Sequence, residues 1–165
     1  MGHTLHAVIG PHTVIEKLWL ETNVIQLPQE FAMVPMTAAL HDDIVELVDI
    51  NKPDPYPDFE RLSAGIAWLL EDRSRHGILA YIETDYFGGV GVQRAIAWQA
   101  GKIACGPILS GSSWEEQGLV VTPSGDTAIN QVLTRIGVRT DRKHDPFDML
   151  GLVRFRHTET AFNER

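Results

Sequence analysis

The sequence predicts an α+β fold with a mainly antiparallel sheet and helices packed on one face of it. Strand-like and helix-like segments alternate irregularly, which does not suit a doubly wound parallel sheet. Three strand-like runs follow one another between Ile78 and Pro107 and indicate a central meander. The chain has 165 residues, of which 44% are hydrophobic, so we expect one domain spanning residues 1–165.

The first quarter of the chain predicts two helices among short strands. Apolar residues at helical spacing indicate a helix over His12–Leu20, and Thr37 is a suitable N-cap for a second helix through Val48. Prolines end the apolar runs around these helices, as they do at strand ends and sheet edges. The strands expected here are Thr4–Ile9, Asn23–Leu27 and Phe31–Met36.

Residues 52–58 contain three alternating prolines, which exclude a helix interior and predict an extended loop. The clearest helical pattern follows, over Phe59–Arg75, and Gly77 suits a left-handed cap at its end. The apolar stripe of this helix predicts four buried side chains, which are Leu62, Ile66, Leu69 and Leu70.

The second half of the chain begins with the meander and ends in short helices. The expected strands are Ile78–Thr84, Val90–Trp98, Ile103–Pro107 and Leu119–Thr122, with a loop over Ser110–Gly118. Ser124 or Asp126 can cap a helix over Thr127–Ile136, and Asp145–Pro146 starts a further helical turn.

Composition restricts the partners and the compartment. The net charge of −8 argues against nucleic acid as the main partner and permits a basic protein partner. The single cysteine, Cys105, excludes an intrachain disulfide and a thiolate zinc cluster and favours a reducing compartment. The start of the chain lacks the pattern of a secretory signal, and no apolar window is long enough for a membrane span. We therefore expect a soluble cytoplasmic protein without a cofactor or metal, and leave its oligomeric state open.

The strongest candidate for a binding site surrounds the first turn of the meander. Glu83 and Asp85 are two residues apart, so a continuous strand places them on one face, where two carboxylates could divide acid and base roles. A dense group of glycines predicts at least one positive φ or a close approach of backbone. The candidate binding residues are Glu83, Asp85, Tyr86, Gly88, Gly89, Gly91, Gln93 and His76.

Other interpretations of the same segment remain. The glycine pattern of nucleotide-binding loops does not match, because Arg94 stands where its third glycine or alanine would be. The residues after Gly91 also alternate as in a strand, whereas a phosphate loop needs a helix N-terminus there. The structural alternative is a glycine-rich bend whose acids are solvated or neutralised by Gln93 and Arg94 across the hairpin. No histidine spacing gives a metal site, and no nucleophile motif is present.

The chain resembles a group of small bacterial proteins, notably from actinobacteria and proteobacteria, that have no known activity. The segments that carry the resemblance are Glu83–Gln93 (ETDYFGGVGVQ), Trp98–Gly101, Met1–Leu5 (MGHTL), Leu27–Phe31 with Pro35, Asn130–Val138 and Asp148–Leu152. The resemblance covers nearly the whole chain. It implies a single bacterial cytoplasmic domain and implies no catalytic residue.

Two classes of function follow. The first is a non-enzymatic binding protein, for instance one resembling an immunity protein, whose acidic surface covers a basic toxin. It predicts an exposed acidic patch without a deep polar cleft. The second is a small enzyme, for example a hydrolase, that uses Glu83 and Asp85 beside the glycine turn. It predicts converging polar groups and a perturbed carboxylate there.

Overall fold

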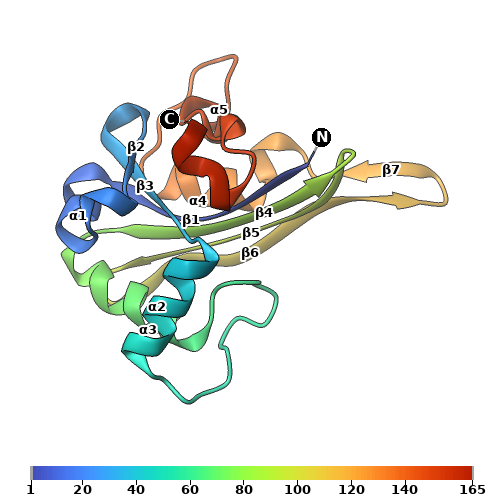
Figure 1. Ribbon diagram of the computed structural model, residues 1–165. Coiled ribbons are helices and arrows are strands. Elements are labelled where there is room, and N and C mark those ends of the chain that lie inside the picture. The colour runs from blue at the N-terminus through green and yellow to red at the C-terminus, as the bar shows by residue number, and fades with distance from the viewer. Residues whose placement is uncertain (1, 165) are drawn as a thin grey trace.

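A seven-stranded antiparallel sheet forms the centre of the computed structural model, which describes residues 2–164 (Figure 1). In spatial order its strands are β2 (Ile25–Gln26), β3 (Phe31–Pro35), β1 (His3–Pro11), β4 (Leu79–Phe87), β5 (Val90–Gln99), β6 (Lys102–Glu115) and β7 (Gly118–Val121). Strands β4, β5 and β6 are the expected meander. The α+β class and the antiparallel sheet are therefore confirmed.

Within residues 2–164, five α-helices cover the sheet: α1 (His12–Leu18), α2 (Ala38–Val48), α3 (Ala64–Arg73), α4 (Ala128–Arg135) and α5 (Pro146–Met149). Short 3-10 turns lie at Glu21–Asn23, Pro28–Glu30, Ser74–His76, Ser124–Asp126, Leu152–Arg154 and Thr158–Glu164. Among the described residues, no helix is long and apolar enough to cross a bilayer.

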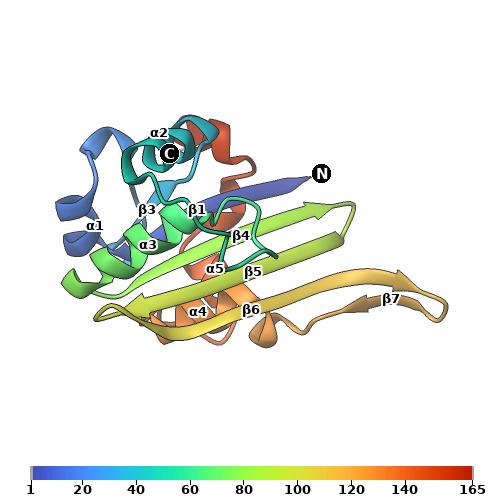
Figure 2. The ribbon, with the colours of Figure 1, turned by 90° about the horizontal axis from the view of Figure 1, so that it is seen from below.

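The helices cover both faces of the sheet, so the expectation of helices on one face was wrong (Figures 1 and 2). Ala80 and Ile82 of β4 belong to a hydrophobic cluster with α4, α5 and the C-terminal turns. Leu79 and Tyr81, which alternate with them, belong to a second cluster with α1, α2 and α3. The physical reason is that strands buried on both faces carry continuous apolar runs and need cover on each side.

The third helix begins later than its sequence pattern predicts. α3 starts at Ala64, and residues 59–63 form an irregular segment that leads from the proline-rich loop. Leu62, Ile66 and Leu70 are buried as expected, whereas Leu69 is only partly buried. Gly77 has φ 156° and ψ 167°, so the expected left-handed cap was wrong and the chain leaves the helix extended.

The segment Ser110–Gly118 was also expected to be a loop, and most of it is strand. β6 continues to Glu115 and pairs first with β5 and then with β7. The serines and glycines of this segment fit a ladder because small side chains allow close strands, and the Ser112 hydroxyl donates to the Gly89 carbonyl oxygen at 2.6 Å. The extended part of β6 forms an exposed hairpin with β7.

Candidate functional site

Glu83, the first candidate acid, is buried beneath the segment that precedes α3. Its side chain is 0% exposed. The carboxylate accepts hydrogen bonds from the backbone amides of Glu60 and Arg61, both at 2.7 Å, and from the Tyr81 hydroxyl at 3.1 Å. The Arg94 guanidinium lies 3.7 Å away. Every oxygen of Glu83 is therefore engaged in holding this segment to the sheet.

Two pairings expected from the hairpin differ in outcome. Arg94 lies opposite Glu83 on β5 and faces its carboxylate, as the alternation predicted. Gln93 instead lies on the other face, where its side-chain oxygen accepts from the Ile129 amide at the start of α4. Burial, followed by the adjacent Glu83 charge, raises the pKa of Tyr81 well above its usual value. The Tyr81 phenol therefore stays a hydrogen-bond donor at neutral pH.

The other candidate residues do not converge with Glu83. Asp85 shares its face but is exposed, near the end of β4. Tyr86 is one residue further along and therefore points to the opposite face. Its partial burial raises the pKa of its phenol. His76 precedes β4, so the length of the strand, roughly 3.3 Å per residue, separates it from Asp85. The sheet and this distance prevent a single cluster.

The glycines at the hairpin form a tight turn. Gly88 has φ 63° and Gly89 has φ 81°, which confirms the expected positive φ and matches a two-residue hairpin turn. Gly91 has no positive φ. Instead, a Cβ there would overlap the backbone carbonyl oxygen of Asp85. The glycines thus serve the turn and the close packing of β4 on β5.

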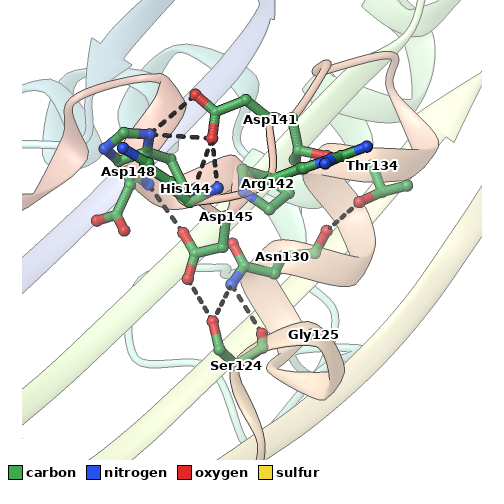
Figure 3. A pocket seen from close by; sticks show the side chains of 12 residues that line it. Ser124, Gly125, Asn130, Thr134, Asp141, Arg142, His144, Asp145 and Asp148 are labelled. Atoms are coloured by element: carbon green, nitrogen blue, oxygen red, sulfur yellow. Dashed lines mark hydrogen bonds and ion pairs between the residues drawn. The ribbon is translucent and has the colours of Figure 1, made fainter.

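A polar pocket of about 500 Å³ lies elsewhere, between the start of α4 and the loop before α5 (Figure 3). Asn130 organises it: its amide nitrogen donates to the Ser124 carbonyl oxygen at 2.8 Å, and its amide oxygen accepts from the Phe147 amide at 2.9 Å. The Ser124 hydroxyl donates to Asp145, which also caps α5 through the Asp148 amide. These bonds join the 3-10 turn Ser124–Asp126, α4 and α5.

The rim of this pocket carries three cationic residues in sequence, Arg142, Lys143 and His144. Asp141 accepts from the backbone amides of Lys143 and His144 and from the His144 ring at 2.9 Å. Within residues 2–164, no ion pair is formed by the side chains of Arg142 or Lys143. Two of the pocket acids, Asp141 and Asp145, are therefore used internally, while the two cations remain available to an anion.

The pocket does not contain a hydrolytic triad. The Ser124 proton goes to Asp145, and His144 faces Asp141, so no described hydrogen bond joins the serine to the histidine. A nucleophile needs a base within hydrogen-bond reach. The sequence analysis missed this pocket, although the run of charges from Arg139 to Asp145 was a usable signal.

The His144–Asp141 pair gives a pH prediction. The Asp141 hydrogen bond raises the pKa of His144 above its ordinary 6.5, and the His144 bond lowers the pKa of Asp141 below its ordinary 3.8. The histidine contribution to stability is complete below pH 6.5 and is lost as pH rises through its folded pKa; the aspartate contribution is lost as pH falls below 3.8. The pair therefore supports its loop most between about pH 4 and 6.5.

An NMR titration of the His144 ring checks this expectation. The wild-type midpoint should lie above 6.5, and Asp141→Asn should move it downward. Asp126→Asn, which changes an exposed acid in the neighbouring turn, serves as the control and should move it less. If the midpoint of the His144 titration is the same in wild type and in Asp141→Asn, the pair does not form in solution.

A second surface collects most of the acidic charge of the protein. Residues 38–60, which form α2 and the following loop, contain seven acids and one lysine, which leaves −6 of the total −8. All seven are exposed: Asp42, Asp43, Glu46, Asp49, Asp54, Asp58 and Glu60. We call this surface the acidic face. The sequence analysis expected an acidic patch without placing it.

Apolar side chains lie beside the acidic charges. Leu47 of α2 is 84% exposed and Leu20 is 73% exposed, and both line a hollow of about 280 Å³ with Trp19, Leu69 and Arg73. Exposed apolar groups rimmed by polar residues are typical of interaction sites. The acidic face thus combines charge with an apolar centre.

The chain matches no protein-family model, no curated protein and no solved structure. The expected kinship with small bacterial proteins therefore stays a prediction.

Proposed function

We propose that this protein is a non-enzymatic binding protein, similar in role to an immunity protein, whose acidic face covers a basic surface of another protein. The observation that carries the proposal is the concentration of −6 charge units on α2 and its following loop, around the exposed Leu47. Acidic residues there attract a basic partner over distance, and the apolar centre provides the desolvated contact.

The arrangement matches the usual anatomy of a protein interface. Affinity is concentrated in a few well-packed apolar or aromatic anchors, and a polar rim surrounds them. Leu47 and Leu20 supply anchors next to the hollow, while Asp43 and Glu46 supply the rim on the same helix. Charged rims mainly raise the association rate and make it salt-dependent.

The alternative function, a small hydrolase using Glu83 and Asp85, has less support. Glu83 is fully buried with both oxygens bonded, and Asp85 lies on the surface. A catalytic pair would need both carboxylates at one accessible position.

The test uses the protein as bait in a bacterial lysate, after which the most strongly retained basic protein is purified. Its Kd is then measured against wild type and against Asp42→Asn/Asp43→Asn/Glu46→Gln. We expect about a tenfold or greater weakening, mostly through slower association, since the rim steers encounter. Leu47→Ala should instead speed dissociation.

A matched variant controls for total charge. Glu30→Gln/Asp126→Asn/Asp148→Asn removes the same amount of charge from exposed acids outside the acidic face. It should retain most of the affinity. If the two triple variants weaken binding equally, the attraction is unspecific and the proposal fails. It also fails if Leu47→Ala leaves the dissociation rate unchanged.

A further inference from the structure

Strands β6 and β7 form a hairpin that projects beyond the rest of the sheet (Figures 1 and 2). The pairing of β5 with β6 ends at Gly91 and Ser112, whereas the pairing of β6 with β7 continues to Glu115 and Gly118. We call residues 112–121 the arm. Its outer part has no neighbouring strand on the β5 side, so it extends into solvent as a two-stranded ribbon.

The arm is unusually apolar for an exposed ribbon. Trp114 is 70% exposed, Leu119 43%, Val120 50% and Val121 57%. Trp114 pairs directly with Leu119, and Val121 is two residues from Leu119, so these three side chains share one face. A two-stranded hairpin is marginally stable in water by itself. An apolar, uncovered ribbon therefore indicates a surface that another chain covers.

β7 is also an edge strand of the sheet. Its backbone groups that point away from β6 have no strand partner in the described part of the chain. Proteins normally protect such edges with charges, prolines or bulges, and β7 has none of these within Gly118–Val121. Edge pairing and apolar contact therefore coincide on the same four residues.

We propose that β7 pairs antiparallel with β7 of a second copy of this chain, which joins two seven-stranded sheets about a two-fold axis. This inference is independent of the proposed function. An isologous pairing centred on Val120 sets it opposite the partner's Val120 and sets Leu119 opposite the partner's Val121, so that facing side chains lie on the same side of the sheet. At each central position an apolar side chain faces an apolar side chain of the partner. The strand can therefore pair with a copy of itself.

The same register brings unlike charges together. The tip of the arm contains Glu115 and Glu116, both exposed. Continuing the pairing past Gly118 places this tip beside the partner's Pro123 and the partner's Ser124. Ser124 and Gly125 line the polar pocket whose rim carries Arg142 and Lys143 without ion-pair partners among residues 2–164. The acidic tip of each arm thus comes near Arg142 and Lys143 on the pocket rim of the other copy.

The contact area supports a stable, modest dimer. A buried tryptophan alone contributes on the order of 150–250 Å². Trp114 and three aliphatic side chains from each copy therefore supply roughly half or more of the ~1,600 Å² of a standard interface. The contact between the tip and the pocket supplies the remaining, polar part of the buried area. The acidic face, on α2 and the following loop, lies on the side of the sheet opposite α4 and α5 and stays accessible.

Sedimentation equilibrium tests the proposal. Wild-type mass should rise with concentration from 18.4 kDa towards twice that value, and high salt should weaken the association. Leu119→Lys/Val121→Lys should remove the dimer. Val153→Lys, at a 54% exposed valine outside the arm, is the matched control and should keep it. The proposal is overturned if the wild-type protein stays monomeric, or if the arm variant has the same dimer mass as wild type.

Charge reversal tests the tip and the pocket. Glu115→Lys/Glu116→Lys and Arg142→Glu/Lys143→Glu should each raise the Kd of the dimer about tenfold. The chain carrying all four substitutions should recover to near the wild-type Kd. If the Kd of the fourfold variant does not recover while the tip variant and the pocket variant both keep the wild-type melting temperature, the tip does not dock in the pocket. Should the lysine variant of β7 misfold, Val120→Arg replaces it and must also give a monomer.

The two proposals can fail separately. Arm variants should lower the mass and retain the basic partner of the acidic face. Leu47→Ala should weaken that partner and retain the dimer mass. If one variant lost both the dimer and the binding of the basic partner, the variant would be unfolded. A lowered melting temperature would show this directly.

Discussion

Glu83→Ala should lower the free energy of unfolding by about 3–5 kcal/mol, the loss typical of removing one partner of a buried ion pair. The substitution leaves the Glu60 and Arg61 amides without their acceptor and leaves Arg94 facing no carboxylate. It also removes the acceptor of the buried Tyr81 hydroxyl. Urea denaturation followed by circular dichroism measures the change as a shift of the midpoint.

Asp85 provides the matched control for this experiment. It lies two residues from Glu83 on the same face but is exposed. Asp85→Ala should therefore change the free energy of unfolding by no more than about 0.5 kcal/mol. The opposite result, a stable Glu83→Ala protein that has lost partner binding, would make Glu83 a site residue. Asp85→Asn with weakened binding and an unchanged melting temperature would likewise implicate Asp85.

Gly91→Ala should destabilise the hairpin by about 3 kcal/mol, the upper end of the usual range for overpacking. The new Cβ would overlap the Asp85 carbonyl oxygen and lie 2.7 Å from the Tyr86 Cα. Both are backbone atoms on β4, so the strands must separate to accommodate it. The urea midpoint measures the loss, and amide exchange should show faster opening of β4 and β5.

Gly89→Ala separates steric overlap from backbone conformation. A Cβ at Gly89 meets nothing within 4 Å, but the residue has φ 81°. Its substitution should cost only the left-handed penalty, about 1–2 kcal/mol. If Gly89→Ala proved more damaging than Gly91→Ala, the packing of β5 against β4 would not be as close as the structure indicates.

The local elements followed from sequence because their signals are local. Alternation predicted β4 and β5, and the apolar stripe predicted the burial of Leu62, Ile66 and Leu70. The face that each helix covers did not follow, since an amphipathic pattern states that a helix packs but not on which side of a sheet. The continuous apolar runs in β1, β3 and the start of β4 were the signal of a sheet covered on both faces.

The candidate site was harder for a related reason. Sequence alternation placed Glu83 on a strand face beside Arg94, and the structure agrees. Its main partners, however, are backbone amides 22 and 23 residues earlier in the chain. Amides carry no side-chain signature, so the sequence could not reveal them. These two amides lie in the irregular segment that precedes α3.

The order of strands has a consequence for the newly synthesised chain. β1 lies inside the sheet, between β3 and β4, and leaves the ribosome before both of them. Its contacts with β4 join residues about 80 positions apart, such as His3 and Thr84. The Thr4 carbonyl oxygen accepts a hydrogen bond from the Thr158 hydroxyl, which lies 154 positions later in the chain. Domains rich in such distant pairings fold slowly, and exposed apolar strands aggregate meanwhile. An apolar strand made first and enclosed last gives this protein a long interval in which a chaperone would be useful.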